Sequence, residues 1–330
     1  MKKGSMVRDL YVVGGKQGAP RPISAGNSNW NGYDQGVILR VDTSTQAAEE
    51  CVAYVSPPEA CLPEGAAITF QAGAIQDNLM YICTQSEVLV FELPTFKQIS
   101  YFSLPFFNDL HHVRPTPDGD LLIANAGLEM VVQMTINGEI CKIWNVLGEE
   151  PWQVNSETDF RKLSTKPHRS HPNYLFYIGS EPWATRFHQG DAICLTQPEK
   201  RIEISKERIH DGLVHEGKIY FTSVNGWIYI ADLSSLKLEK AINLSDMHPE
   251  GTLLGWCRSL FVDGDRLWVG FSRIRPTKWR ENVTWLMRGF KYVQPTHIGC
   301  YDLVKGEYIE EVNLEPMGLN AVYSIFPVTD

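Results

Sequence analysis

Polar side chains that could bind a ligand or a metal ion recur in front of short apolar segments along the chain. They are Gln71, His112, His168, His210, Cys257 with Arg258, and Asn320, at separations of 41, 56, 42, 47 and 63 residues. Neutral imidazole is a preferred ligand of zinc and other transition metals, and three histidines with an open fourth position describe a catalytic zinc site. We therefore expect His112, His168 and His210 to hold a divalent transition-metal ion.

Residues next to these positions could complete a catalytic centre. Asp211 or His111 could transfer a proton, and Arg258 or Arg169 could bind an anionic group. The expected substrate contacts are Gln71, Asn320, Trp183, Arg186 and Trp279. Two alternatives stay open: a polar channel that binds no metal, and a nucleophilic Cys257 activated by the adjacent arginine.

The segments that follow these polar residues have the pattern of β-hairpins. After His210, apolar segments at 218–222, 227–231 and 238–244 are separated by turns, one of which is Asn225-Gly226. Four strands in roughly 40 to 50 residues are typical of one blade of a β-propeller. The sequence thus predicts an all-β, six-bladed β-propeller, with blades that start near residues 71, 112, 168, 210, 257 and 320.

The two ends of the chain are predicted to share the last blade. One apolar segment, 320–326, follows the final repeat, and residues 9–55 contain three further strand-like segments. Pairing of the two ends would close the ring and remove exposed strand edges, so residues 1–330 would form a single domain. The first strand of each blade would line a central channel, and the polar residues in front of these strands would meet at one mouth.

One blade resembles a known family of repeats. Residues 117–127, with the sequence PDGDLLIANAG, and residues 136–139, INGE, resemble the NHL repeat and the six-bladed propellers of the SMP-30/gluconolactonase and strictosidine-synthase-like superfamily. This resemblance implies the fold. Gluconolactonase-type enzymes hold a metal with carboxylate and asparagine ligands, for which only Asn320 and Asp211 stand in suitable places. The three histidines are instead similar to the zinc site of peptide-amidating lyases, so zinc or another transition metal is expected rather than calcium.

Composition limits the partners of the protein. The 330 residues carry a formal net charge of −9, which disfavours binding to nucleic acid or to anionic membranes. No segment approaches the roughly 18 consecutive apolar residues of a membrane-spanning helix. The seven cysteines are scattered and odd in number, and the start of the chain lacks the apolar core of a signal peptide. We therefore expect reduced thiols and a cytoplasmic protein.

Two functions fit these observations. The first is a metal-dependent hydrolase or lyase that acts on a small polar or anionic substrate at the channel mouth. The second is a non-catalytic propeller that binds a ligand or a partner protein. Residues 272–296 combine basic and aromatic side chains, so they could cover an anionic substrate, contact a protein partner or mediate self-association.

Overall fold

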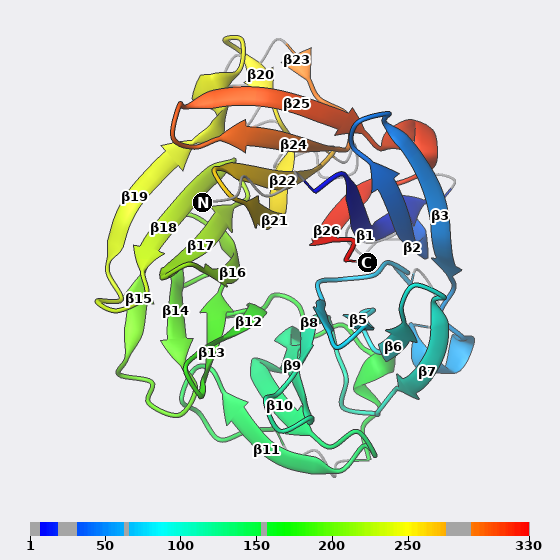
Figure 1. Ribbon diagram of the computed structural model, residues 1–330. Coiled ribbons are helices and arrows are strands. Elements are labelled where there is room, and N and C mark those ends of the chain that lie inside the picture. The colour runs from blue at the N-terminus through cyan, green and yellow to red at the C-terminus, as the bar shows by residue number, and fades with distance from the viewer. Residues whose placement is uncertain (1–6, 19–31, 63–65, 153–156, 275–291, 330) are drawn as a thin grey trace.

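The structure, a computed structural model, describes residues 7–18, 32–62, 66–152, 157–274 and 292–329. Its strands form six four-stranded antiparallel sheets that surround a central axis as the blades of a propeller (Figure 1). A separate parallel pair consists of β20 (Thr252–Leu253) and β23 (Tyr292–Val293). The predicted all-β, six-bladed propeller is confirmed.

Blades 1 to 3 follow one another along the chain, each written with its innermost strand first. Blade 1 contains β4 (Ala74–Gln76), β5 (Leu79–Cys83), β6 (Val88–Glu92) and β7 (Lys97–Phe102). Blade 2 contains β8 (Leu110–Pro115), β9 (Leu121–Asn125), β10 (Met130–Met134) and β11 (Ile140–Asn145). Blade 3 contains β12 (Pro172–Ile178), β13 (Glu181–Arg186), β14 (Asp191–Cys194) and β15 (Arg201–Glu203).

Blades 4 to 6 complete the ring. Blade 4 contains β16 (Ile209–His215), β17 (Lys218–Ser223), β18 (Trp227–Asp232) and β19 (Leu238–Asn243). Blade 5 contains β21 (Trp256–Asp263), β22 (Arg266–Ser272), β24 (His297–Asp302) and β25 (Glu307–Asn313). Blade 6 contains β26 (Ala321–Pro327), β1 (Asp9–Gln17), β2 (Tyr33–Asp42) and β3 (Ala47–Tyr54). Short 3₁₀ turns are η1 (Pro58–Ala60), η2 (Ala126–Leu128), η3 (Phe160–Lys162), η4 (Leu244–Met247) and η5 (Glu315–Met317).

Blade 6 is built from both ends of the chain, as the sequence predicts. The inner strand β26 pairs antiparallel with β1, in a register that runs from Leu10 opposite Pro327 to Gly15 opposite Ala321. The six inner strands begin at residues 74, 110, 172, 209, 256 and 321, all within a few positions of the predicted blade starts. Because the first and last blades are thereby joined, each blade has a neighbour on both sides.

Apolar side chains fill every interface between blades. Of seven clusters of buried apolar residues in the described part of the chain, six each lie between one pair of neighbouring blades. For example, Val90 of blade 1 and Val132 of blade 2 belong to one cluster, and Val12 of blade 6 and Trp268 of blade 5 belong to another. Since both faces of a blade are covered, its middle strands are apolar on both faces, as in β9, where all five residues are buried.

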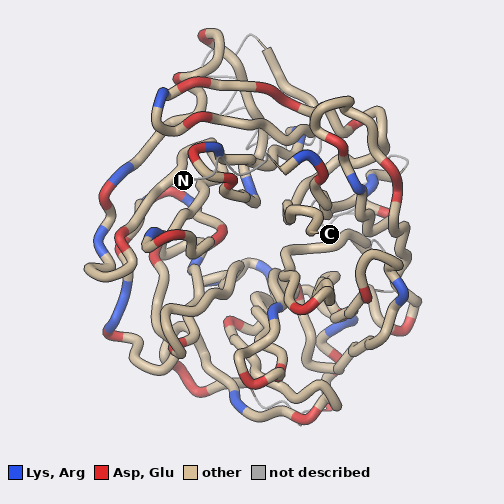
Figure 2. Tube along the Cα trace, in the orientation of Figure 1, with Lys and Arg blue, Asp and Glu red and all other residues tan. Residues whose placement is uncertain are grey.

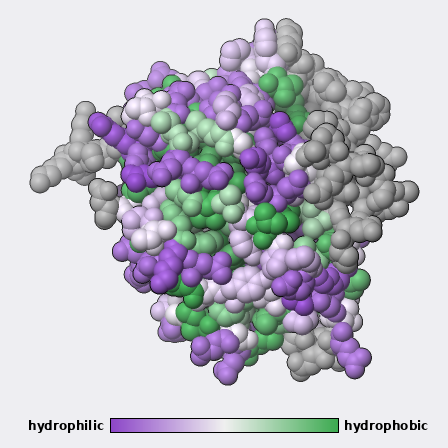
Figure 3. Space-filling view, turned by 90° about the vertical axis from the view of Figure 1, so that its right-hand side faces the viewer, coloured by the Kyte–Doolittle hydropathy of each residue, from purple (hydrophilic) through white to green (hydrophobic). Residues whose placement is uncertain are grey.

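The outermost strands of the blades face solvent and are largely polar. In β3 and β19 most residues are exposed, and acidic and basic side chains are interspersed around the rim (Figure 2). The side of the ring that carries β3 and β7 interleaves hydrophobic and hydrophilic side chains (Figure 3). No helix in the described residues is long and apolar enough to cross a membrane.

Bulges interrupt the inner strands of blades 2 to 6. The pairing of each of these strands with its neighbour shifts register once. The shift lies between Leu110 and His112 in β8, and between His210 and Leu213 in β16. A bulge adds an unpaired residue and so resets which side chains point to which face of the sheet. Side chains near the channel mouth therefore do not follow the simple alternation of a strand.

Ring closure depends on a close approach of two backbones at Gly14. A Cβ atom at this position would overlap the carbonyl of Ala321 in β26. We predict that Gly14→Ala lowers the free energy of unfolding by about 1–3 kcal/mol, because the terminal strands must separate to admit the methyl group. Urea denaturation measures the change.

Gly299→Ala in β24 is the matched control. There an added Cβ would lie 3.1 Å from the nearest atoms, which belong to the side chain of Tyr301 and not to a backbone. Equal stability losses in the two variants would contradict a special role for the closure at Gly14.

Candidate functional site

Ionisable side chains from four blades converge at one mouth of the channel. Asp109 and His111 lie at the start of β8 in blade 2, and His168 and His171 directly precede β12 in blade 3. Blades 4 and 5 contribute His210 and Arg258. The rings of His111 and His171 are 4.2 Å apart, centre to centre, so the contributions of blades 2 and 3 touch.

Asp109, His168 and His171 form the group of described residues best arranged to hold a metal ion. One ligand atom from each lies within 4.8 Å of the others. The two Nδ1 atoms of His168 and His171 are 2.7 Å apart, and Oδ2 of Asp109 lies 3.6 Å from Nδ1 of His168. Two imidazole nitrogens and a carboxylate oxygen are the donor types that zinc binds.

The loop that carries the two histidines is held by a carboxylate. Glu129 accepts hydrogen bonds from three consecutive backbone N–H groups, those of Arg169, Ser170 and His171. The bond from His171 is 2.8 Å long. Glu129 therefore fixes the backbone between the two candidate ligands without contacting the ligand atoms themselves.

A second set of hydrogen bonds orients the ring of His168. Its Nε2 lies 3.2 Å from the hydroxyl of Thr165, and that hydroxyl donates to Oδ1 of Asn108 at 2.8 Å. A hydroxyl that already donates elsewhere accepts from Nε2–H, which leaves the lone pair of His168 on Nδ1. Partners of this kind commonly orient histidines that bind metals.

The charge states at the mouth favour binding of a cation. Burial lowers the pKa of His111 to about 3 and holds the pKa values of His171 and His210 well below the usual range. These imidazoles are thus neutral at pH 7, the form that binds metals. Burial opposes ionisation of Asp109, but the nearby positive groups, led by Lys166, outweigh it and lower the pKa of this carboxyl to about 2.

Several buried polar atoms around the mouth have no hydrogen-bond partner in the described structure. They are Nε2 of His111, Nε2 of His210, Nε and Nη1 of Arg258, and both amide atoms of Gln71. Leaving such groups unpaired costs about 1–3 kcal/mol each, so native proteins rarely retain them. Their concentration beside Asp109, His168 and His171 points to a site that a polar ligand or water completes.

Arg258 is flanked by two aromatic rings and forms no ion pair with a carboxylate of the described residues. Its guanidinium lies 4.8 Å from the ring centre of Tyr323 and 5.5 Å from that of Trp256. The residue is 8% exposed, and none of the carboxylates in the described part of the chain forms an ion pair with it. A buried, preorganised guanidinium of this kind suits a planar anionic group.

His112, a predicted metal ligand, does not lie with the other candidate ligands. Its Nε2 lies 3.0 Å from the carbonyl of Gly73, and its Nδ1 accepts a hydrogen bond of 3.2 Å from the backbone N–H of Leu175. Both ring nitrogens are therefore used to join blade 2 to blades 1 and 3. Among the described residues, the structure groups His168 with Asp109 and His171, and not with His112 and His210.

Asp211 likewise has a structural role between blades. Its carboxylate accepts hydrogen bonds from the hydroxyl of Thr222 and from the backbone N–H of Ser259, at 2.5 and 2.9 Å. Burial raises the pKa of this carboxyl to about 6, and the two hydrogen bonds limit the rise. The predicted proton carrier thus connects blades 4 and 5, whereas His111 lies beside the candidate metal ligands.

Two residues that were predicted to contact the substrate are packed inside the protein instead. Trp183 is 2% exposed and stacks on Phe176 between blades 3 and 4. Arg186 forms a buried ion pair with Asp191 and donates to the carbonyl of Val146 at 2.9 Å. Neither side chain is available at the mouth.

The remaining predicted site residues differ in their exposure and in their partners. Arg169 is exposed and pairs with Glu149 at 2.7 Å, and Asn320 accepts from the backbone N–H of Gln17 through its side-chain oxygen. Cys257 is fully buried, which raises the pKa of its thiol well above the usual value and disfavours a nucleophilic role. Trp279 and most of the 272–296 segment lie outside the described residues, so their proposed contacts stay predictions.

All seven cysteines lie in the described part of the chain, and none forms a disulfide. This agrees with the expected reduced thiols. Neither Asp109 nor His171 was among the predicted metal ligands, and Glu129 was not among the predicted site residues. The spacing of Asp109 and His111 in front of a strand was a usable signal, whereas the contact of Glu129 with residues 169–171 depends on the tertiary structure.

Comparison with known proteins supports the fold alone. No protein-family model matches the chain, and no curated protein matches it in sequence. Among solved structures, the chain is similar to a protein of unknown function from Bacteroides caccae, with 13% identity, a TM-score of 0.62, and coverage of 99% of this chain and 100% of that chain. It also matches the β-propeller domain of Cps50 (Swd1) from Myceliophteria thermophila, with 10% identity, a TM-score of 0.48, and coverage of 84% and 80%. The first likeness supports the propeller fold, and the second is too weak to carry an argument.

The buried, neutral state of His112 predicts sensitivity to acid. Burial lowers its pKa from 6.5 to about 3, so the unfolded chain takes up a proton that the folded chain excludes. This contribution to stability is complete above pH 6.5 and is lost as the pH falls toward 3, at roughly 1.4 kcal/mol per pH unit. We predict that His112→Gln, which retains one donor and one acceptor, reduces the pH dependence of the free energy of unfolding between pH 6 and 4 by about this amount. Urea denaturation across that range measures the slope.

His215→Gln, at a half-buried position on β16, serves as the control for the replacement of a histidine by glutamine. An unchanged slope in the His112 variant would contradict the exclusion of the proton.

Proposed function

We propose that the protein is a metal-dependent hydrolase or lyase that acts on a small anionic molecule at this channel mouth. Asp109, His168 and His171 would hold zinc or another divalent transition metal. The observation that carries the proposal is the convergence of these three ligand atoms within 4.8 Å. The relation to NHL-repeat and SMP-30-type propellers belongs to the same proposal and is supported by the six-bladed fold.

The distances from Nδ1 of His168 to the other two donors are close to those that zinc needs. In a tetrahedral site with zinc–nitrogen bonds of about 2.0–2.1 Å, ligand atoms lie about 3.3 Å apart. The 3.6 Å between Asp109 and His168 agrees with this spacing, and the 2.7 Å between the two Nδ1 atoms requires only a small separation of the rings. Without an ion, one of these nitrogens must donate a hydrogen bond to the other, and an ion would take the place of that proton.

Lys166 competes with a metal for the Asp109 carboxylate. Its Nζ lies 3.3 Å from Oδ2 of Asp109. Since a divalent ion carries the larger charge, it would displace the ammonium from this oxygen and leave Lys166 near the edge of the site. The side chain of Lys166 is 31% exposed, so it can turn toward solvent.

The remaining residues at the mouth supply the other functions of a catalytic centre. A bound divalent ion polarises a substrate oxygen or lowers the pKa of a bound water. His111, whose Nε2 lies 3.8 Å from Oδ1 of Asp109, would form a hydrogen bond to a group bound beside the ligands, since its low pKa makes it a weak proton acceptor. Arg258 would bind the anionic group of the substrate through its unpartnered Nε and Nη1 atoms.

Metal analysis tests the proposal directly. We predict that the protein, stripped with a chelator and titrated with zinc in a calorimeter, binds one ion per chain, and that Asp109→Asn and His171→Ala each weaken binding at least a hundredfold. His215→Ala should bind zinc as the wild type does. If the wild type binds no zinc, or if the Asp109 and His171 variants bind zinc as tightly as the wild type, the proposal is contradicted and the alternative of a non-catalytic propeller is favoured.

Substitution of Glu129 tests the metal site without changing any of the proposed ligands. Glu129→Gln keeps the size of the side chain but removes the charge that holds three N–H groups of the ligand loop. We predict a 10- to 100-fold loss in zinc affinity, the usual effect of removing an outer partner of a metal site. Glu149→Gln, which alters the exposed partner of Arg169 in the same loop, should leave zinc affinity unchanged. Equal affinities of the Glu129 variant and the wild type would remove Glu129 from the site.

A further inference from the structure

A second pocket lies toward the opposite end of the channel. Arg114 follows His112 in β8, and Leu213 follows Asp211 in β16. Both therefore lie farther along the inner strands, away from the mouth that contains Asp109. Between the two ends, the ring of His112 stacks on that of Tyr174 at a centre-to-centre distance of 4.1 Å. The pocket therefore belongs to a different part of the channel from the proposed metal site.

Arg114 brings a positive charge into this pocket without a carboxylate to balance it. Burial lowers the pKa of its guanidinium, and none of the ion pairs among the described residues includes it. Nη1 donates a hydrogen bond of 3.3 Å to the carbonyl of Leu175, and Nε has no partner. The guanidinium lies 5.1 Å from the ring centre of Tyr177. A largely buried cation that is held by one long hydrogen bond and a ring retains the capacity to bind an anion.

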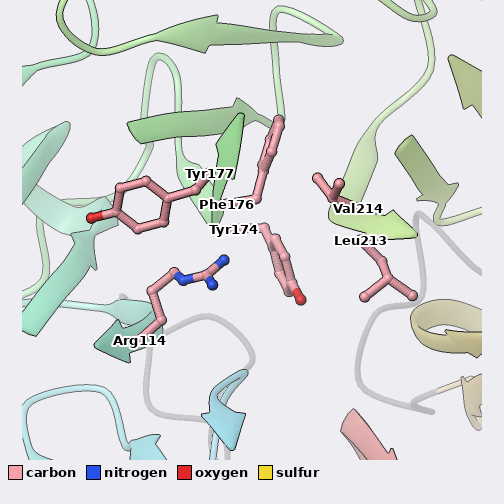
Figure 4. Close-up of a pocket in the computed structure, with 7 residues that line it drawn as sticks. Arg114, Tyr174, Phe176, Tyr177, Leu213 and Val214 are labelled. Carbon is pink, nitrogen blue, oxygen red and sulfur yellow. The ribbon is translucent and has the colours of Figure 1, made fainter. Parts of the chain in front are cut away.

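The rest of the pocket is small and is lined by three aromatic and two aliphatic side chains, with polar as well as apolar atoms at its surface. It encloses about 140 Å³ and is lined by Arg114, Tyr174, Phe176, Tyr177, Gly212, Leu213 and Val214. In Figure 4 the guanidinium projects between the rings of Tyr177 and Tyr174, and Leu213 and Val214 lie on the other side of Tyr174. A cavity of about 150 Å³ holds one benzene molecule, which limits the ligand to that size.

Gly212 is needed for the shape of this wall. A Cβ atom at this position would lie 2.5 Å from the ring of Phe176. The absence of a side chain lets the backbone of β16 approach the aromatic residues of β12. The pocket is thus formed by a close contact between blades 3 and 4.

We propose that this pocket binds a small monocarboxylate with a compact apolar body. The carboxylate would form a charge-assisted pair with Arg114, for which the planar guanidinium is suited, and the body would pack among Phe176, Leu213 and Val214. One largely buried cation without a carboxylate partner matches a single negative charge, whereas a phosphate dianion would bring an unbalanced second charge. This inference is independent of the metal site and goes beyond the proposed function.

Benzoate is the probe, followed through the methyl signals of Leu213 and Val214 in ¹H–¹³C NMR spectra. We expect a saturable shift of these signals, and binding at least tenfold weaker for benzamide, which has nearly the same shape but no charge. Inorganic phosphate should not displace benzoate. A wild-type protein that does not saturate with benzoate, that binds benzamide as tightly, or that binds phosphate in its place would overturn the proposal.

Variants assign the binding to the pocket. Arg114→Met should weaken benzoate binding at least tenfold, and Arg40→Met, on the exposed outer face of β2, should not. Because Arg114 also contacts Leu175, Leu213→Trp provides a second test: it fills the pocket, leaves the arginine in place and should abolish binding. His171→Ala, which alters the proposed metal site, should bind benzoate as the wild type does. The two proposals can therefore fail independently. Wild-type affinity in either pocket variant would overturn the assignment.

Discussion

The pairing of β1 with β26 is the contact on which the arrangement of the whole molecule depends. It joins strands from opposite ends of the chain, opposing Leu10 to Pro327. Closing so long a loop is entropically unfavourable, and the apolar clusters between blades 5 and 6 and between blades 6 and 1 offset that cost. With the ring closed, the inner strands of all blades face one axis, and side chains from blades 2 to 5 meet at a single mouth.

The mouth concentrates groups that a folded protein ordinarily avoids burying together. Neutral histidines, an ionised aspartate and an arginine with unpartnered nitrogens lie within a few side chains of one another. Clusters of strongly shifted ionisable groups are more common at functional sites than elsewhere, because binding and catalysis need them. A divalent ion between Asp109, His168 and His171, with an anion at Arg258, would satisfy most of these groups at once.

The architecture could be predicted from the sequence because it depends on a repeated local pattern. Apolar segments, Asp-Gly and Asn-Gly turns and the incomplete last repeat indicate blades, and the termini pair as expected. The site was predicted less well because bulges decide which residues face the mouth. His111 and His112 are neighbours in sequence, yet the first contacts His171 whereas the second bonds to the backbones of blades 1 and 3. Glu129 is hydrogen-bonded to residues 169–171, about 40 residues away in the sequence, and no local sequence pattern indicates this contact.

The position of a bound ion tests this account most directly. Crystals of the protein grown with zinc, measured above and below the zinc absorption edge, locate the metal by its anomalous scattering. The account predicts a single strong peak about 2.0–2.1 Å from Nδ1 of His168, Nδ1 of His171 and a carboxylate oxygen of Asp109, with Lys166 turned away from that oxygen. A crystal grown with zinc that shows no peak at this mouth, with Lys166 still paired to Asp109, would contradict it.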